Sequence, residues 1–280
     1  MHFPHRDVTR ACHRSWRGAW AVGLLFCASA AVGQIDLGLS LEHRAYLLGE
    51  PFAARVRIHN ELDVPLVFDD DYRNGELFVE LLHNKSAGIP DASRQPVSRA
   101  TVVMPGNSKI ELVEITSLFN LFQAGGYSLR IGVKYEGDTY LSPPMGFDLV
   151  QGIEIQTVRR RLSGYRDIDL EYSLRYWKRM KGEQAFLVIR STRDDSAIYG
   201  TFLLGPVVRV NPPAIKFDSQ GRVIVVHQSG RNRFSRSVFE VDSAGASFVE
   251  QTHHLEDGRP YPERPGTAPK PVGLEQKGQE

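Results

Sequence analysis

The chain has 280 residues, with 34 Lys and Arg against 33 Asp and Glu and a formal net charge of +1. So balanced a charge gives no sign of a nucleic-acid or membrane-surface partner, which an excess of basic residues would indicate. Both cysteines, Cys12 and Cys27, lie near the N-terminus, so the rest of the chain is expected to contain no disulfide and no Cys-based zinc site.

Residues 1–33 have the three parts of a secretory signal. Four arginines precede a short apolar run, and the small residues Ala31 and Gly33 follow it. The run is too short and too rich in Ala and Gly for a stable span, which needs about 20 apolar residues. We expect cleavage after Gly33, or alternatively after Ala30, and a secreted or periplasmic product. The other interpretation is a retained N-terminal anchor. Removing the four Arg and one Asp of the leader changes the net charge from +1 to −2.

Residues 34–150 are predicted to form a β-sandwich. Apolar and polar residues alternate over residues 35–41, 52–59 and 127–135, which is typical of antiparallel strands with one buried face. Further strands are expected at 65–68, 76–82, 97–103, 109–115 and 145–150. Short strands at this spacing, separated by turn residues, favour a sandwich.

The segment Tyr46-Leu-Leu-Gly-Glu-Pro51, the strand that ends at Asn60, and Val64-Pro-Leu-Val-Phe68 together resemble the opening of bacterial immunoglobulin-like domains. Ala124-Gly-Gly-Tyr127 is similar to a tyrosine corner, in which the Tyr hydroxyl bonds to backbone upstream. The resemblance gives Gly125 and Tyr127 structural roles, although Gln123 stands where an acidic residue is usual. It covers this unit alone and implies no activity.

Residues 151–255 are predicted to form a second β-rich unit, a meander or a small sandwich. Strands are expected at 153–158, 168–176, 185–190, 198–203 and 207–210. Two similar hairpins follow, each with an Asp-Ser-x-Gly turn, in which the Asp caps the turn and the Gly supplies a positive φ. The turn residues are Asp218 with Gly221 and Asp242 with Gly245. The piece from Leu203 to Gln228 resembles a family of uncharacterised exported bacterial proteins, which implies export and domain pairing only.

Residues 256–280 are rich in Pro and Gly and poor in apolar side chains. This composition predicts a disordered tail or a tether. The fold class expected for the whole chain is therefore all-β, with an immunoglobulin-like sandwich followed by the meander unit and the tail.

Two clusters raise the question of a metal site. Asp69-Asp70-Asp71 offers oxygen ligands, but without the spacing of a calcium loop. His253 and His254 are neighbours that point to opposite faces of a strand, and no metal motif accompanies them. The chain also contains no P-loop, no dinucleotide fingerprint and no Gly-x-Ser-x-Gly elbow. We expect no metal, no cofactor and no catalytic residue that can be named.

Three basic clusters remain: Arg159–Arg161 at the junction of the units, Arg231, Arg233 and Arg236 between the hairpins, and a group around Trp177. The third has the highest local density of aromatic and basic side chains. Alternation places Tyr172 and Tyr176 on the core face, with Trp177 on the solvent side. The binding residues expected here are Tyr172, Arg175, Trp177 and Arg179, where an aromatic ring and planar cations can stack on a ligand.

The function favoured by these patterns is an exported, non-catalytic binding or scaffold protein, with an unknown protein or a polysaccharide as partner, no nucleic acid, and no membrane span after cleavage. A hydrolase of envelope or extracellular polymers, with its carboxylates on loops, is an alternative. An assembly subunit that pairs through strand edges is another. A cleft with two carboxylates within about 10 Å of each other, near aromatic side chains, would favour the hydrolase. A flat patch of aromatic and Arg side chains without such a pair would favour binding.

Overall fold

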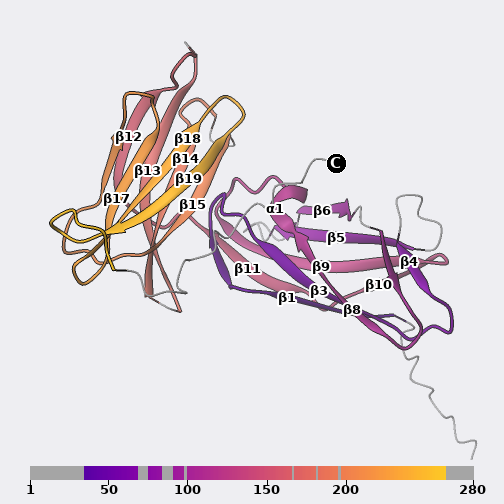
Figure 1. The fold of residues 1–280 in the computed structure, drawn as a ribbon. Coiled ribbons are helices and arrows are strands. Elements are labelled where there is room, and N and C mark those ends of the chain that lie inside the picture. Colours follow the sequence, from indigo (N-terminus) through magenta and orange to yellow (C-terminus); the bar gives the residue numbers. More distant parts are fainter. Residues whose placement is uncertain are drawn as a thin grey trace, which may run out of the picture. The chain divides into compact units, whose positions relative to one another are not determined.

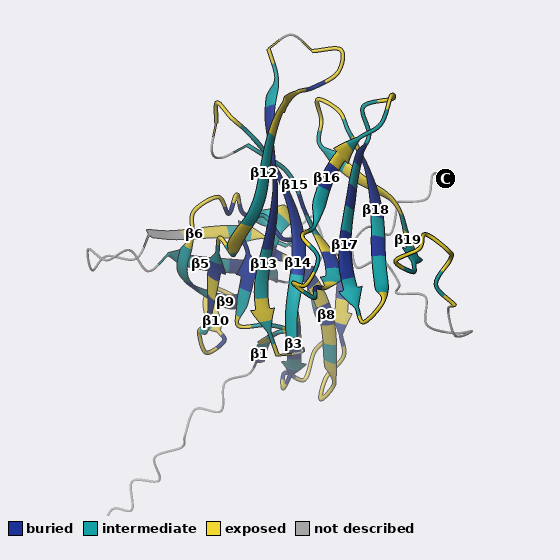
Figure 2. Cartoon of the chain, turned by 90° about the vertical axis from the view of Figure 1, so that its left-hand side faces the viewer, coloured by how far each residue is buried: buried dark blue, intermediate teal, exposed yellow. Residues whose placement is uncertain are grey.

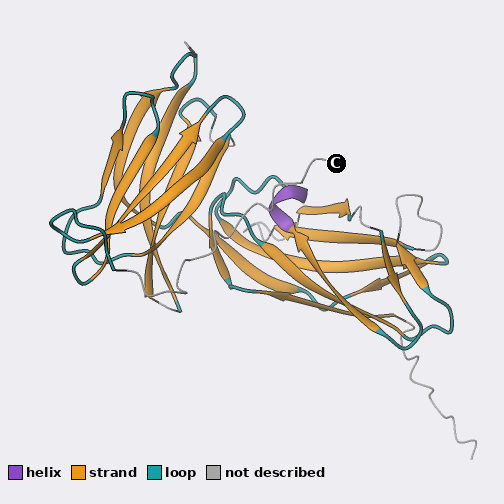
Figure 3. Cartoon of the chain, in the orientation of Figure 1, coloured by secondary structure: helices purple, strands orange, loops and turns teal. Residues whose placement is uncertain are grey.

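A computed structural model describes residues 35–68, 75–83, 91–97, 100–165, 167–180, 182–194 and 197–262. The expected leader and the Asp69–Asp71 cluster lie outside these residues, as does most of the expected tail. The fold is all-β, as the alternation predicted, and α1 (Ile115–Leu118) is one turn long (Figure 3). The described part contains no helix long and apolar enough to cross a membrane.

The strands up to Val150 form three sheets (Figure 1). One has the order β1-β3-β8, and a larger one has the order β2-β11-β9-β5-β6 with β10 on β9, while β4 and β7 pair separately. The bounds are β1 Ile35–Leu41, β2 Ala45–Leu47, β3 Ala53–Asn60, β4 Leu66–Phe68, β5 Glu76–His83, β6 Asp91–Pro96, β7 Thr101–Val103, β8 Ser108–Glu114, β9 Gly125–Tyr135, β10 Asp138–Leu141 and β11 Met145–Val150. The short strands β2, β6 and β10 were not predicted.

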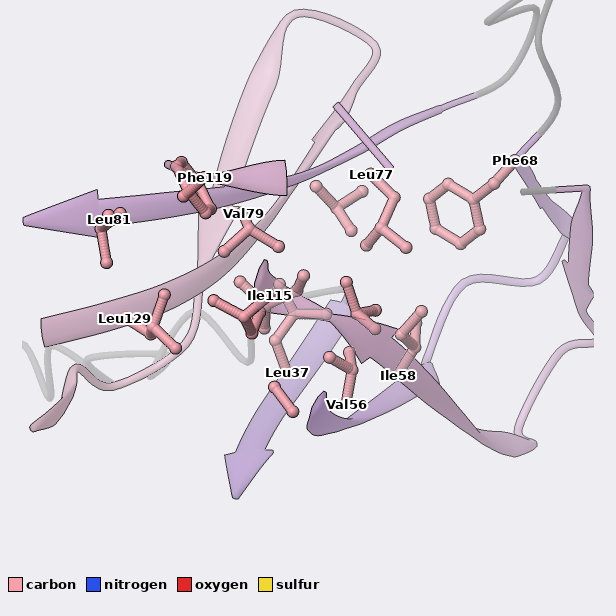
Figure 4. Close-up of a cluster of buried hydrophobic side chains, with 14 of the residues drawn as sticks. Leu37, Val56, Ile58, Phe68, Leu77, Val79, Leu81, Ile115, Phe119 and Leu129 are labelled. Atoms are coloured by element: carbon pink, nitrogen blue, oxygen red, sulfur yellow. The ribbon is translucent and has the colours of Figure 1, made fainter. Parts of the chain in front are cut away.

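Alternation explains how these sheets pack. In β3, Ala54, Val56 and Ile58 are fully buried, whereas Arg55 and Arg57 between them are exposed. Figure 4 shows Val56 and Ile58 facing Leu77 and Val79 of β5 across the core. Burying such aliphatic side chains contributes about 1.5–3 kcal/mol each relative to leaving them in water, so this core is the main source of stability before Val150.

Tyr127 ties the start of β9 to the preceding segment. Its hydroxyl donates a 2.8 Å hydrogen bond to the carbonyl oxygen of Gln123, and its ring stacks on His83 at 4.4 Å between centroids. Gly125 has φ +153°, and a Cβ there would lie 3.1 Å from Nε2 of His83. Tyr127 therefore fixes the start of β9 through its hydroxyl bond, as the tyrosine-corner pattern indicated, and Gly125 leaves room for the His83 ring.

After Gly152 the chain forms two four-stranded antiparallel meanders, in the orders β12-β13-β14-β15 and β16-β17-β18-β19. One buried cluster takes side chains from both sheets, including Leu174, Leu187, Val225 and Phe239. Figure 2 shows β13 and β14 largely buried and the edge strand β12 more exposed. The bounds are β12 Ile153–Arg161, β13 Asp169–Arg179, β14 Gly182–Ser191, β15 Ile198–Pro206, β16 Ala214–Phe217, β17 Val223–Gly230, β18 Arg233–Val241 and β19 Ala246–His254.

The two Asp-Ser-x-Gly turns join β16 to β17 and β18 to β19. The Asp218 carboxylate accepts bonds from the backbone N–H groups of Gln220 and Arg222, each at 2.9 Å. The Asp242 carboxylate accepts from Ala244 and Gly245 at 2.8 and 3.0 Å. Gly221 and Gly245 have φ +83° and +158°, so each turn uses the Asp cap and the permissive Gly that its sequence indicates.

Two details after Gly205 differ from the sequence prediction. Residues 207–210 are not a strand, because the Val207 N–H bonds Glu183 of β14 while the next N–H, of Val208, bonds Gln228 of β17. Arg233 and Arg236 belong to β18 and do not form a loop, since β17 and β18 pair directly up to Gly230 and Arg233. The first residues of the expected tail bond back to β19, with the Tyr261 N–H donating to the carbonyl of His253 at 2.9 Å.

Candidate functional site

The candidate site lies on the β12–β15 sheet, on the face turned away from the meander core. The inner face of β13 carries Tyr172, Leu174 and Tyr176, as alternation predicted. Tyr172 is only 2% exposed and meets Phe217 edge-on, with ring centroids 5.0 Å apart, and burial raises the pKa of its hydroxyl. Tyr172 therefore belongs to the core and does not share a face with the other three residues expected to bind a ligand.

Arg175 lies on the outer face, but its guanidinium is already occupied. It donates to the Ser173 hydroxyl at 3.0 Å, to the backbone carbonyl of Gln151 at 2.9 Å and to the Glu154 carboxylate at 3.1 Å. Burial lowers the pKa of this guanidinium, against the opposing effect of Glu154. These hydrogen bonds satisfy a buried cation. Arg175 therefore holds Gln151 and Glu154 against β13 and is not available to bind a ligand.

Arg179 and Trp177 are likewise engaged, Arg179 by Glu50 in the turn after β2 and Trp177 by Leu47 at the end of β2. Arg179 pairs with the Glu50 carboxylate, which also accepts the Leu47 N–H at 2.9 Å. Trp177 is half-buried against a small cluster of Leu47, Phe186 and Val188. Trp177 lies on the face opposite Tyr172 and Tyr176, as alternation predicted, but it is half-buried because Leu47 of β2 packs against it.

The other half of the outer face is open, and a row of three side chains crosses it. Arg159, Glu171 and Arg190 lie opposite one another on β12, β13 and β14. Arg159 donates through Nε and Nη2 to one oxygen of Glu171, both at 3.0 Å, and Arg190 donates through the same atoms to the other oxygen at 2.8 and 2.6 Å. The side chain of Glu171 is 5% exposed and that of Arg159 is 74% exposed. The carboxylate is thus buried beneath two guanidinium groups.

A second row of the same kind follows two residues further along. Asp169 lies opposite Arg161, which it meets at 3.2 Å, and its other oxygen is 4.0 Å from Arg193. We call the six residues Arg159, Arg161, Asp169, Glu171, Arg190 and Arg193 the arginine ladder. Four cations and two carboxylates give it a charge of +2, in a chain otherwise near neutrality.

The sequence pointed to only part of the arginine ladder. Arg159 and Arg161 belong to a basic cluster that was noted, while Arg160 between them points to the other face and lies over the Phe217 ring at 4.5 Å. Arg190 and Arg193 were missed: Arg190 meets Glu171 only through the pairing register of β13 with β14, and Arg193 reaches Asp169 from beyond the end of β14.

The remaining candidates have local partners. Arg233 lies over the Tyr261 ring at 5.2 Å, and Arg236 meets Glu250 at 2.9 Å. His253 shares a 2.9 Å bond with the Ser235 hydroxyl, and the His254 ring lies near Phe234. Within the described ranges, no group of three or more His, Cys, Asp or Glu side chains is arranged to hold a metal ion.

A pocket of about 350 Å³ lies beside the turn after β2. Its lining includes Glu50, Phe52, Asn120 and Ile198. Glu50 is the one carboxylate among its described lining residues, and Arg179 and Leu47 already engage it. This pocket does not present the pair of carboxylates that would favour a glycoside hydrolase.

No protein-family model matches the chain, and no curated protein matches it. Among solved structures, the alkylpurine DNA glycosylase AlkC of Pseudomonas fluorescens, bound to DNA containing an abasic site analog, is similar over 42% of this chain and 30% of its own, at 14% identity and a TM-score of 0.31. The sporulation control protein Spo0M of Bacillus subtilis is similar over 81% of this chain and 92% of its own, at 8% identity and a TM-score of 0.28. Likenesses this weak carry no argument about fold or function.

Proposed function

We propose that this protein is an exported, non-catalytic binding protein and that its arginine ladder binds an acidic polysaccharide. The observation that carries the proposal is the pair of Arg–carboxylate–Arg rows on one open sheet face. The leader-like composition of residues 1–33 supports export.

The arginine ladder is suited to anions because its cations are held in place. Glu171 bonds Nε and Nη2 of both Arg159 and Arg190, and Nη1 of each guanidinium takes no part in these bonds. A planar guanidinium that is already fixed loses less side-chain entropy when it bonds a second carboxylate or sulfate. The two rows are two residues apart, about 6.7 Å along a strand. A polysaccharide with carboxylates on successive sugars can therefore contact both rows at once.

The chemistry of the face favours an acidic polysaccharide over a nucleic acid. The nearby Ser173 hydroxyl is buried and already bonded to Thr157 at 3.1 Å and to Arg175 at 3.0 Å, so the face offers a ligand mainly its guanidinium groups. None of the six residues of the arginine ladder is aromatic, whereas single-stranded nucleic acids are usually held by stacking on aromatic side chains. Fixed guanidinium groups suit the carboxylate groups of an acidic sugar.

The state of Glu171 supports binding without catalysis. Burial alone would raise the pKa of this carboxyl, but hydrogen bonds from Arg190 and Arg159 lower it below its ordinary value. A glycosidase needs one carboxyl whose pKa is raised, so that it can donate a proton to the leaving oxygen. A carboxylate kept ionised by two guanidinium groups serves to position cations.

The test is binding of the purified protein to polygalacturonate, measured by calorimetry in about 50 mM salt. Replacing Arg161 and Arg193 by Gln removes two exposed cations and leaves Glu171 with both of its partners. We expect affinity to fall about tenfold or more, which corresponds to about 1.4 kcal/mol, and wild-type binding to weaken strongly at high salt.

Arg259→Gln is the matched control, because Arg259 is a similarly exposed arginine paired with Asp257 in the turn after β19. Equal binding to neutral dextran, or no effect of the double substitution, would contradict the proposal.

A further inference from the structure

The larger sheet of the first unit, in which β6, β5 and β9 are neighbours (Figure 1), carries another Arg–carboxylate–Arg row. Arg94 of β6, Glu80 of β5 and Arg130 of β9 lie directly opposite one another. Nη2 of Arg94 donates to one oxygen of Glu80 at 3.0 Å, and Nη1 of Arg130 lies 3.8 Å from the other oxygen. Glu80 alternates with the core residues Val79 and Leu81, so this row lies on the face turned away from the core.

An aromatic ring beside this row holds Arg94 in place. Phe78 lies two residues earlier on the same face of β5, and Gly132 opposite it leaves room for the ring, since a Cβ there would lie 2.1 Å from Cζ of Phe78. The Arg94 guanidinium lies over the ring at 4.2 Å from its centroid, and Nζ of Lys134 is 5.8 Å from the same centroid. Lys134 also donates to Glu76 at 2.7 Å. Contact with a ring and with a carboxylate restricts these cations before any ligand arrives.

We call Arg94, Arg130 and Lys134 the basic trio. Their side chains are 42%, 36% and 46% exposed. The distance of 3.8 Å from Arg130 to Glu80 is too long for a hydrogen bond, and Nε of Arg130 has no hydrogen-bond partner among the described residues. A guanidinium has five N–H donors, so Arg130 keeps donors for an anion. Three cations against the carboxylates of Glu76 and Glu80 give this face a charge of +1.

We infer that the basic trio is a second site for the carboxylates of an acidic polysaccharide, an inference that rests on the proposed function of the arginine ladder. Arg94 and Arg130 stem from the strands on either side of β5, about 10 Å apart, so two carboxylates of a repeating acidic chain can each meet a cation. The Phe78 ring is fully buried beneath the cations and does not offer the stacking surface that single-stranded nucleic acids use.

The second site is the weaker of the two. Its charge is +1, against +2 for the arginine ladder. Arg130 is not fixed by hydrogen bonds to Glu80, whereas Glu171 bonds two nitrogens of both Arg159 and Arg190. A cation that is less fixed loses more side-chain entropy when a ligand binds.

Calorimetric titration with short oligogalacturonate in about 50 mM salt counts the sites. The wild type is expected to bind two ligands per chain. Replacing Arg94 and Arg130 by Gln should weaken the second site about tenfold or more, whereas replacing Arg161 and Arg193 by Gln should weaken only the first. Arg57→Gln is the matched control, because Arg57 is half exposed, bonds a carboxylate of β1 at 2.8 Å and lies on another sheet of the same unit.

The outcomes separate this inference from the proposed function. One ligand per chain, weakened only by the ladder substitutions, would overturn the inference and leave the proposed function intact. A second site that keeps its affinity without Arg94 and Arg130 would overturn it equally, and a wild type that binds no ligand would overturn both.

A second measurement leaves the basic trio unchanged. In protein with Arg161 and Arg193 replaced by Gln, the Nε signals of Arg94 and Arg130 should shift in nuclear magnetic resonance spectra as oligogalacturonate is added. Signals that do not move would overturn the inference. Circular dichroism and the urea midpoint should show that every variant folds.

Discussion

At the scale of single residues, Tyr127 is a brace whose contribution can be measured. Its hydroxyl bonds the Gln123 carbonyl at 2.8 Å from a largely buried position. Tyr127→Phe removes this bond and keeps the ring stacked on His83, so we expect a loss of about 0.5–1.5 kcal/mol in the free energy of unfolding, measured by urea denaturation. Tyr165→Phe removes an exposed hydroxyl bonded to Ser243 and should lower the free energy of unfolding by less. Equal stability of the two variants would show that the Tyr127–Gln123 hydrogen bond does not stabilise the fold.

His227 should make stability depend on pH. It is buried in β17, where burial lowers its pKa from 6.5 to about 4, while a hydrogen bond to the Pro206 carbonyl acts in the opposite direction. Because the folded pKa lies below the unfolded one, folding favours the neutral ring. This stabilisation is complete above pH 6.5 and is lost as the pH falls toward 4, by up to about 3 kcal/mol at 1.36 kcal/mol per pKa unit.

The measurement is the free energy of unfolding at pH 7 and pH 5. The wild type should lose stability between them, whereas His227→Gln, which can still donate to Pro206, should lose markedly less. His254→Gln serves as the control, because His254 is less buried and lies at the end of β19. If His227→Gln loses as much stability between pH 7 and pH 5 as the wild type does, then groups other than His227 cause the pH dependence.

At the scale of elements, the turn after β2 depends on Gly49. Its φ is +76°, and a Cβ there would lie 2.7 Å from Oγ1 of Thr201 and 2.8 Å from Cγ2 of Ile198. Gly49→Ala should therefore cost backbone strain of about 1–2 kcal/mol together with a steric clash. Gly106→Ala is matched in strain, with φ +68° and no atom near the added Cβ. Thermal unfolding should show the larger loss for Gly49→Ala, and equal losses would mean that the Thr201 contact is not tight.

The sequence predicted elements better than it predicted their partners. Alternation identified β1, β3 and β9, because one buried face imposes a period of two, and the Asp-Ser-x-Gly turns identified both hairpins of the last sheet. It missed β2 and β10, which are too short to show a period. It assigned Trp177 to the correct face of β13 but expected it in solvent, because alternation does not show that Leu47 of β2 packs against that face.

The arginine ladder shows the same limit. Arg190 and Glu171 are 19 residues apart in the chain and meet only through the register of β13 with β14. A single sequence does not fix that register, so half of the cations on the face could not be predicted. The polar residues that alternation placed on the outer face of β13 were identified correctly, but their chemistry depends on the strands on either side.

At the scale of the whole molecule, the central claim is that an acidic polysaccharide binds at the arginine ladder. Nuclear magnetic resonance of the labelled protein during titration with oligogalacturonate tests it most directly. We predict that the largest shifts occur at the side-chain Nε groups of Arg159, Arg161, Arg190 and Arg193 and at nearby amides of β12 to β14, and that they disappear at high salt. Shifts centred on the pocket beside Glu50, or no shifts at all, would contradict the claim.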